Sequence, residues 1–311
     1  MFKGLLVGVS FLLSLAPAFA AETIKVAIGS GGNLEAFIVE IGNRGGFFEK
    51  QGLKPEVFYT AGGGETLQAI ISQSAQFGVS IGATGAVGAF SKGAPLRIIG
   101  ASTIGSANYW YVPATSPIRR MEDIAGHTLA YSTTGSGTHA VALAVRARGI
   151  DAKLVATGNT GATFTQVMTG QVDVGFAFAE FGQDALAAGK IRVLFKDNDF
   201  DRIRNQALRI IAVHKSASAD MAARFMRAYA DSVDWIYSAD PKPLQIYAEM
   251  IKSDVATAKK LRDDFYSREM LSVEKVKGLD IIMQDALDGK FIQKPLTQAQ
   301  IEELVAPSAR P

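Results

Sequence analysis

Four turns of the chain combine glycine with small hydroxyl residues, at residues 29–33, 62–66, 80–85 and 132–139. Each turn follows a short apolar run and leads into a helical pattern. The start of a helix presents unpaired backbone N–H groups and the positive end of its dipole, which bind an anion or a carbonyl oxygen without a lysine. Ordinary helix caps and tight turns use the same residue types, so one such turn alone indicates little. Four of them around one cleft predict a binding site.

Aromatic and acidic residues near these turns are further candidates for ligand contact. In an extended Tyr-Trp-Tyr segment, alternation sends Tyr109 and Tyr111 to one face and Trp110 to the other. Phe178 ends a later apolar run, and Glu180 follows it as either a polar contact or an exposed turn residue. Core packing explains such aromatic residues equally well.

The sequence holds no recognisable catalytic or metal-binding constellation. Its histidines, His127, His139 and His214, have no carboxylate or second histidine at metal-ligand spacing. Residues 29–32 faintly resemble a dinucleotide-binding turn, but Asn33 begins the stretch where a third glycine is required. We therefore expect no enzyme activity, no cofactor and no metal. His139 remains a candidate for ligand contact because it lies at a helix start.

Composition excludes several classes of protein. The chain has 311 residues, no cysteine, 32 basic and 30 acidic residues, and a net charge of +2. The lack of cysteine excludes disulfide frameworks, thiolate zinc sites, iron–sulfur clusters and thiol nucleophiles. The near-neutral charge argues against nucleic-acid binding. The length predicts two domains.

The first 20 residues have the pattern of an export signal. Residues 1–3 carry a lysine, residues 4–15 are almost entirely apolar, and residues 18–20 read Ala-Phe-Ala after Pro17. The apolar run of about 12 residues is too short to span a membrane as a retained anchor. We expect cleavage after Ala20 and, because no cysteine follows, a free periplasmic protein rather than a lipoprotein.

The elements that position the turns form two similar series. Apolar runs of about five residues alternate with helical patterns of about ten, which is typical of βα units in a mostly parallel sheet. The predicted strands cover residues 24–28, 57–59, 77–81, 96–100, 129–132, 154–155 and 172–178. The two series match at an offset of 149 − 52 = 97 residues, with Gly52, Thr60, Gly64, Thr66 and Gly78 corresponding to Gly149, Thr157, Gly161, Thr163 and Gly175. The match indicates either two lobes of like topology or coincidence between glycine-rich βα units.

The rest of the chain completes this arrangement. Amphipathic helical patterns over residues 219–238, 243–252, 255–265 and 273–287 predict a helical tail that packs on one lobe. Extended segments near residues 108–112 and 209–213 flank the second series, which suggests an inserted lobe joined by two crossings. Two crossings make the hinge of a clamshell that closes on a ligand.

Several longer segments are similar to a known family. These segments are residues 45–53 (GGFFEKQGL), 89–96 (AFSKGAPL), 116–118 with 122–126, and 169–175 (TGQVDVG). Over about residues 24–305 the chain resembles the periplasmic substrate-binding proteins of ABC importers in the nitrate/sulfonate/taurine group, which have the α/β type II periplasmic-binding fold. The resemblance implies a signal peptide (1–20), a discontinuous first lobe (21–109 and 208–311) that carries the C-terminal helices, and an inserted second lobe (110–207).

The resemblance also implies a ligand site in the cleft between the lobes. Matched position by position, it indicates Asn33, Ser80, Thr84, Tyr109, Ser136, Thr138, His139 and Phe178. The turns and neighbouring residues add Gly63, Gly64, Trp110, Ser132, Gly137 and Glu180 as ligand-binding candidates. None of the four turns contains an arginine, which argues against an inorganic-anion pocket. We expect a small organic ligand with a sulfonate, carboxylate or pyrimidine-like character.

The family implies an ABC permease with its ATPase as the partner, and we expect the binder to be a monomer. Two alternatives stay open: a ligand sensor that docks to a membrane receptor on the same fold, and a secreted enzyme. The enzyme would require a nucleophile and base that the sequence does not reveal. A pyrimidine-precursor synthase of the same fold uses a cysteine-rich motif, which this chain lacks.

Overall fold

The computed structural model describes residues 21–273 and 276–306, so the predicted signal peptide lies outside the described residues. A five-stranded sheet forms the first lobe, in the order β2-β1-β3-β10-β4. Strands β1, β2 and β3 run parallel, and β10 runs antiparallel to both of its neighbours. The strands are β1 (Glu22–Gly29), β2 (Leu53–Thr60), β3 (Phe77–Gly82), β4 (Leu96–Thr103) and β10 (Arg209–His214).

The second lobe repeats this order with shorter strands. Strands β6 and β7 pair in parallel, and β5 lies between β8 and β9, antiparallel to both. A parallel bridge between Leu129 and Val174 connects the two groups, which gives the order β7-β6-β8-β5-β9. This order agrees with the predicted likeness of the two series. The strands are β5 (Asn108–Pro113), β6 (Thr128–Tyr131), β7 (Lys153–Ala156), β8 (Gly175–Phe178) and β9 (Ile191–Lys196).

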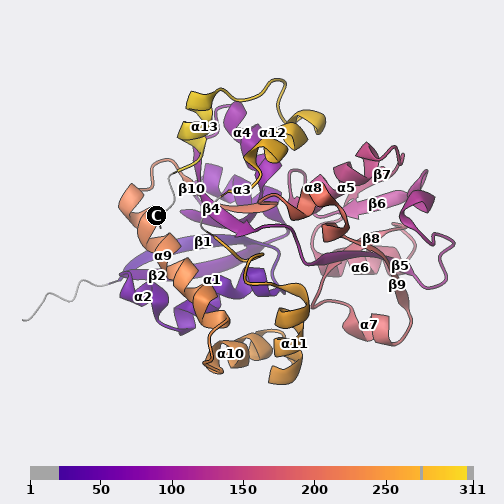
Figure 1. Ribbon diagram of the computed structural model, residues 1–311, viewed down its shortest axis with the longest axis horizontal. Helices are drawn as coiled ribbons and strands as arrows, with labels where there is room; N and C mark the ends of the chain where they lie inside the picture. Colours follow the sequence, from indigo (N-terminus) through magenta and orange to yellow (C-terminus); the bar gives the residue numbers. More distant parts are fainter. Residues whose placement is uncertain (1–20, 274–275, 307–311) are drawn as a thin grey trace, which may run out of the picture.

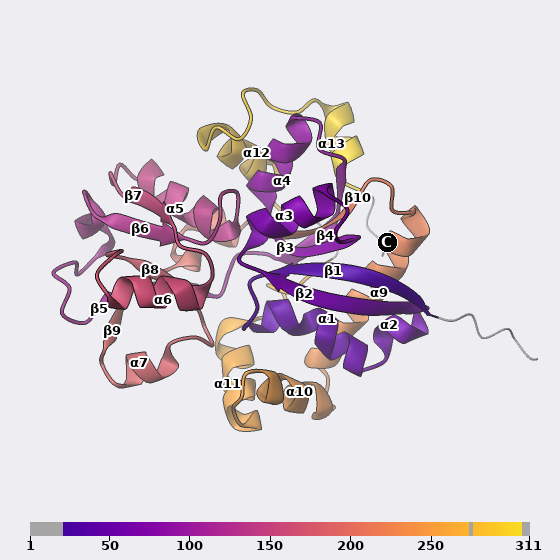
Figure 2. The same cartoon turned by 180° about the vertical axis from the view of Figure 1, so that it is seen from behind.

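Helices cover both faces of the first sheet, and others pack on the second (Figures 1 and 2). The first lobe carries α1 (Leu34–Arg44), α2 (Phe47–Lys50), α3 (Gly63–Ile71), α4 (Ala83–Ser91), α9 (Ala219–Ile236), α10 (Lys242–Met250), α11 (Val255–Phe265), α12 (Leu279–Asp288) and α13 (Gln298–Leu304). The second lobe carries α5 (Gly137–Ala147), α6 (Thr160–Met168), α7 (Gln183–Ala187), α8 (Asp201–Arg204) and short 3₁₀ turns at Met121–Ile124 and Asp197–Asp199. Among the described residues, no helix is long and apolar enough to cross a membrane.

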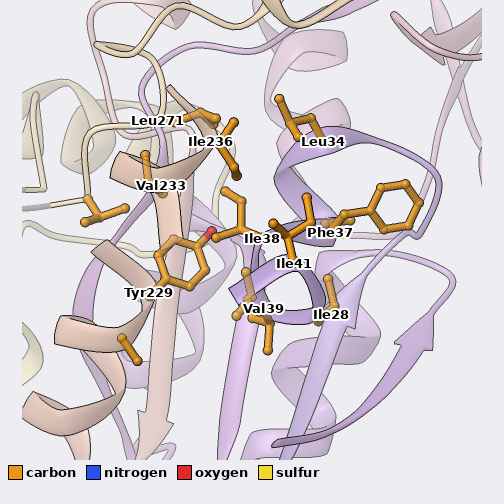
Figure 3. Packing of buried hydrophobic residues seen from close by; sticks show 14 of the residues in the cluster. Ile28, Leu34, Phe37, Ile38, Val39, Ile41, Tyr229, Val233, Ile236 and Leu271 are labelled. Atoms are coloured by element: carbon orange, nitrogen blue, oxygen red, sulfur yellow. The ribbon is translucent and has the colours of Figure 1, made fainter. Parts of the chain in front are cut away.

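Apolar residues three and four positions apart fix the helices to the first sheet. Leu34, Ile38 and Ile41 form one buried face of α1, and Val233 and Ile236 of α9 pack beside them (Figure 3). This cluster is separate from the buried cluster of the second lobe, which centres on β5, α5 and β8. The two lobes therefore have their own cores.

Two short crossings connect the lobes, as the extended segments predicted. The segments 108–112 and 209–213 are strands β5 and β10, each in the interior of its sheet. The backbone N–H of Gly105 donates to the carbonyl of Gln206 at 3.0 Å, so the two crossings are hydrogen-bonded to each other. One predicted boundary is wrong: the last long helix begins at Leu279 instead of residue 273, because Gly278 adopts a left-handed conformation at its N-cap.

Candidate functional site

The helix-starting turns of the two lobes lie in direct contact. The backbone N–H of Gly64 in the first lobe donates to the hydroxyl of Thr133 in the second at 3.0 Å. A methyl group at Gly82 would lie 1.9 Å from the carbonyl oxygen of Gly135, closer than any real contact. Glycine is therefore required at these turns by the approach of the other lobe.

Behind this contact lies a narrow pocket with walls from both lobes. The space between its walls is about 10 Å³, no more than one water molecule needs. With the lobes in this arrangement, the pocket has no room for an organic ligand. The pocket is lined by Gly29, Ser30, Gly63, Ser80, Ser132, Ser136, Gly137, Thr138, Phe176, Phe178 and Arg209.

The second lobe contributes a cluster of hydroxyl groups at the start of α5. The Thr138 hydroxyl lies 3.0 Å from the hydroxyls of both Ser132 and Ser136. Ser136 also caps α5, accepting the backbone N–H of His139 at 3.1 Å. The cluster lies at the positive end of the helix dipole, where it can donate to an anion or a carbonyl oxygen.

The first lobe contributes two serines in an unusual backbone conformation. Ser30 and Ser80 both have φ of 62°, in the left-handed region that non-glycine residues seldom adopt. Ser30 follows β1, Ser80 lies within β3, and both are buried. Backbone strain of this kind concentrates at ligand-binding sites, where it fixes the direction of a side chain.

The pocket also contains an arginine that the sequence analysis missed. Arg209, on β10, is buried, and its Nη1 donates to Glu35 Oε2 at 3.0 Å. Ser102 donates to the other oxygen of Glu35 at 2.8 Å, so both carboxylate oxygens are hydrogen-bonded and the carboxylate is fixed beside the guanidinium. Arg209 lies on strand β10 and not in one of the four turns. A charged residue between Leu208 and Ile210 was the available signal.

Half of the predicted residues lie together in the pocket. Those seven are Gly63, Ser80, Ser132, Ser136, Gly137, Thr138 and Phe178. Four lining residues were not predicted, namely Gly29, Ser30, Phe176 and Arg209, although the first two belong to one of the four turns.

The two predicted residues of β5 serve the core of the second lobe. Trp110 is fully buried, stacks on Phe195 with ring centroids 5.4 Å apart, and donates from Nε1 to Asp197 at 2.6 Å. The Tyr109 hydroxyl donates to the carbonyl of Phe181. Neither residue lines the pocket, since both faces of β5 are buried in the second lobe.

The remaining predicted residues of the turns do not line the pocket. Asn33 caps α1 by accepting the N–H of Ala36 at 3.0 Å, and Gly64 packs against the opposite turn. Thr84 lines a separate hollow of about 850 Å³ between α5, α8 and α12.

His139 packs between aromatic rings at the junction of the lobes. It stacks on Tyr131 at 4.3 Å between centroids and meets the edge of Phe291 at 5.7 Å. Its Nδ1 accepts the backbone N–H of Gly135 at 3.1 Å, and burial lowers its pKa to about 4. The ring is therefore neutral at pH 7.

Comparison with known proteins places the chain in a family. The family model described as NMT1/THI5 like matches residues 34–242, more than half of the chain. No curated protein matches the chain in sequence.

Solved structures of low sequence identity share the fold. The alkanesulfonate-binding protein SsuA from Xanthomonas axonopodis pv. citri, bound to MOPS, has a TM-score of 0.73 at 15% identity, over 94% of this chain and 100% of that one. The periplasmic aliphatic sulphonate binding protein SsuA from Escherichia coli has a TM-score of 0.69 at 18% identity, over 92% and 93%. The Candida albicans CA3427 gene product, with the generic periplasmic binding protein fold, has a TM-score of 0.71 at 11% identity, over 92% and 97%. The chain therefore has the periplasmic-binding-protein fold that the family resemblance implied.

Proposed function

Because the chain belongs to the NMT1/THI5-like family, we propose that it is an exported solute-binding protein that closes two lobes on a small organic ligand. The observation that carries this proposal is the pocket between the helix-starting turns of both lobes. The expected lobes are 21–109 with 208–311, and 110–207; because Asn108 and Tyr109 already pair in the second sheet, we place the first boundary just before Asn108. The proposed compartment is the periplasm, after cleavage behind Ala20.

The mechanism is closure around the two hydrogen-bonded crossings. In the open state, each lobe presents half of the pocket to water. A ligand that contacts Ser80 and Arg209 on one side and Thr138 on the other gains all its contacts only when the lobes close. This difference in affinity shifts the population to the closed form, which an ABC permease with its ATPase then receives.

The lining indicates a ligand with an anionic end and an apolar body. Arg209 donates one N–H bond to Glu35 in the structure, and a guanidinium has further donors to offer. The hydroxyl cluster and the start of α5 add donors without charge. Phe176 and Phe178 supply an apolar surface. A sulfonate or a carboxylate fits this set, and the alkanesulfonate-binding structural relative supports the first.

The geometry favours binding over turnover. A hydroxyl nucleophile requires a base within hydrogen-bond reach. The hydroxyls of Ser132, Ser136 and Thr138 hydrogen-bond one another, and His139 Nδ1 is occupied by a backbone N–H. The pocket therefore lacks the pairing that a secreted hydrolase would use.

Isothermal titration calorimetry on the full mature protein tests the proposal. The panel comprises alkanesulfonates, MOPS, aromatic and aliphatic carboxylates, and pyrimidines. We expect saturable binding of at least one sulfonate or carboxylate. A correctly folded protein that binds no member of the panel would contradict the proposed function.

The role of Arg209 requires a paired design, because removing it alone leaves Glu35 buried without a partner. We therefore compare Glu35→Gln with the double variant Glu35→Gln, Arg209→Gln. The double variant should lose at least 10-fold more affinity for the anionic ligand. Arg44→Gln, at an exposed ion pair, is the matched control. Equal affinities in the two Glu35 variants would exclude Arg209 from ligand recognition.

A further inference from the structure

The carboxylate of Glu180 connects the two lobes outside the pocket. Glu180 follows β8 in the second lobe, and three donors of the first lobe bind it. The backbone N–H of Leu34 donates to Oε1 at 2.8 Å, and the hydroxyl of Tyr247 donates to the same oxygen at 2.6 Å. The hydroxyl of Tyr266 donates to Oε2 at 2.9 Å.

The first lobe holds the two tyrosines in place by contacts of its own. The ring of Tyr247 on α10 packs against Phe37 of α1, with centroids 6.4 Å apart. The hydroxyl of Tyr237 donates to the carbonyl of Tyr266 at 2.7 Å, where α11 ends. In both views α11 lies on the side of α10 that faces the second lobe (Figures 1 and 2). The donors therefore form a prepared receptor that a carboxylate of the second lobe enters.

A carboxylate suits this contact better than a neutral group. Hydrogen bonds to an ionised acceptor are roughly twice as strong as neutral ones. Burial raises the pKa of the Glu180 carboxyl, while the hydrogen bonds from Tyr247, Leu34 and Tyr266 act in the opposite direction. The donors thus offset part of the cost of removing the charge from water, and they are available to Glu180 only when the lobes meet.

We propose that Glu180 is a positioning residue that acts as a clasp between the lobes and raises ligand affinity without touching the ligand. The link to affinity rests on the proposed function, in which the closed state binds. Apparent affinity is proportional to the fraction of protein in the binding-competent state. A clasp that raises a small closed fraction therefore raises affinity by the same factor.

The absence of native cysteine allows the distance between the lobes to be measured directly. Lys190→Cys in the second lobe and Lys260→Cys in the first place spin labels at exposed positions, for pulsed electron paramagnetic resonance on the ligand-free full chain. We expect Glu180→Gln to lower the ratio of closed to open protein about 10-fold. Asp184→Asn, an exposed carboxylate of the same lobe, should leave the ratio unchanged.

The double variant Tyr247→Phe, Tyr266→Phe tests the same contact from the first lobe. It should lower the ratio about as far as Glu180→Gln, and combining all three substitutions should add little, since each side loses the same interaction. Distance distributions that match the parent in both variants would overturn the clasp. If Glu180→Gln does not fold, the tyrosine variant decides alone. Because no ligand is used, a failed ligand screen would contradict the proposed function and leave the clasp in place.

Discussion

The sheets of the two lobes have the same strand order but differ in strand length and in how their strands are connected. The first has strands of six to eight residues, with helices on both faces. In the second, β6 and β7 have four residues each, and one isolated bridge connects them to β8. A matched pair of threonines marks the likeness: the hydroxyls of Thr60 and Thr66 lie 2.8 Å apart, and those of Thr157 and Thr163 lie 2.6 Å apart.

The difference appears in the turns that follow these equivalent strands. Helix α3 begins at Gly63, directly after its N-cap Gly62, whereas α6 begins at Thr160, directly after its N-cap Asn159. A methyl group at Gly64 would lie 2.5 Å from the carbonyl oxygen of Thr134, across the lobes. At Gly161 the nearest atom is the Asn159 side chain of the same turn, at 3.4 Å. The first turn is shaped by the other lobe, and the second only by its own helix.

The largest difference is expected between two variants that each add one methyl group, one in each turn. Gly64→Ala should weaken binding of the ligand found by calorimetry more than 100-fold, because the lobes cannot close fully over the added carbon. Gly161→Ala should leave affinity unchanged and raise stability by up to about 1 kcal/mol, since alanine favours the helix. Thermal unfolding of both variants is the control for folding. Equal affinities would mean that the two turns are functionally equivalent.

Two buried carboxylates near the crossings differ in their partners. Glu35 is paired with Arg209 at 3.0 Å, whereas Asp197 accepts a hydrogen bond from Trp110, and burial raises its pKa to about 6. Between pH 4 and 6 the folded protein binds this proton more tightly than the unfolded chain. Asp197 therefore lowers stability as pH rises, and the penalty is complete above pH 6.

Asp197→Asn should remove this penalty while keeping an acceptor for Trp110. We expect the variant to be about 3 kcal/mol more stable than the parent at pH 7, with the difference vanishing near pH 4. Urea unfolding across this range measures it, and Asp184→Asn controls for the loss of one exposed charge. A variant less stable than the parent at pH 7 would mean that the ionised carboxylate is needed at the crossings.

Much of this arrangement could be predicted from the sequence, because glycine and hydroxyl residues at strand ends have strong local preferences. The four turns, the two series of strands and the offset of 97 residues all follow from local pattern. Gly64 and Gly161 are matched by that offset, but nothing local distinguishes the one that meets the other lobe.

The residues that were missed or misplaced depend on contacts between distant segments. Arg209 enters the pocket because β10 begins directly after the second crossing, and Trp110 lies outside the pocket because β5 is covered on both faces. Glu180 binds donors 146, 67 and 86 residues away. Neither the periodicity of apolar residues nor secondary-structure propensity predicts contacts between residues so far apart in the sequence.

The two threonine pairs test the likeness of the two lobes through smaller expected changes in unfolding free energy. Thr66→Val and Thr163→Val each remove a buried hydroxyl that bonds the partner threonine and a carbonyl of the turn. We expect both to cost about 1–2 kcal/mol of unfolding free energy. Only Thr66→Val should also weaken ligand binding, because its turn lines the pocket. Similar losses of affinity in both would contradict the assignment of the pocket to the first turn.

The smallest effect is expected when the second turn is made to resemble the first. Asn159 caps α6 by accepting the N–H of Ala162 at 3.0 Å, and the equivalent residue of the first lobe is Gly62, which has no side chain to cap α3. Glycine is nearly as good a cap as asparagine, so Asn159→Gly should cost only a few tenths of a kcal/mol. Asn159→Ala should cost about 1 kcal/mol, since alanine offers no acceptor and lacks the freedom of glycine.

Thermal unfolding resolves the two variants, and a loss above 1 kcal/mol for Asn159→Gly would show that this residue does more than cap its helix. If the expected order holds, lobe contact alone accounts for the glycine at residue 62, where asparagine would collide with Ser132 and Thr133 of the second lobe.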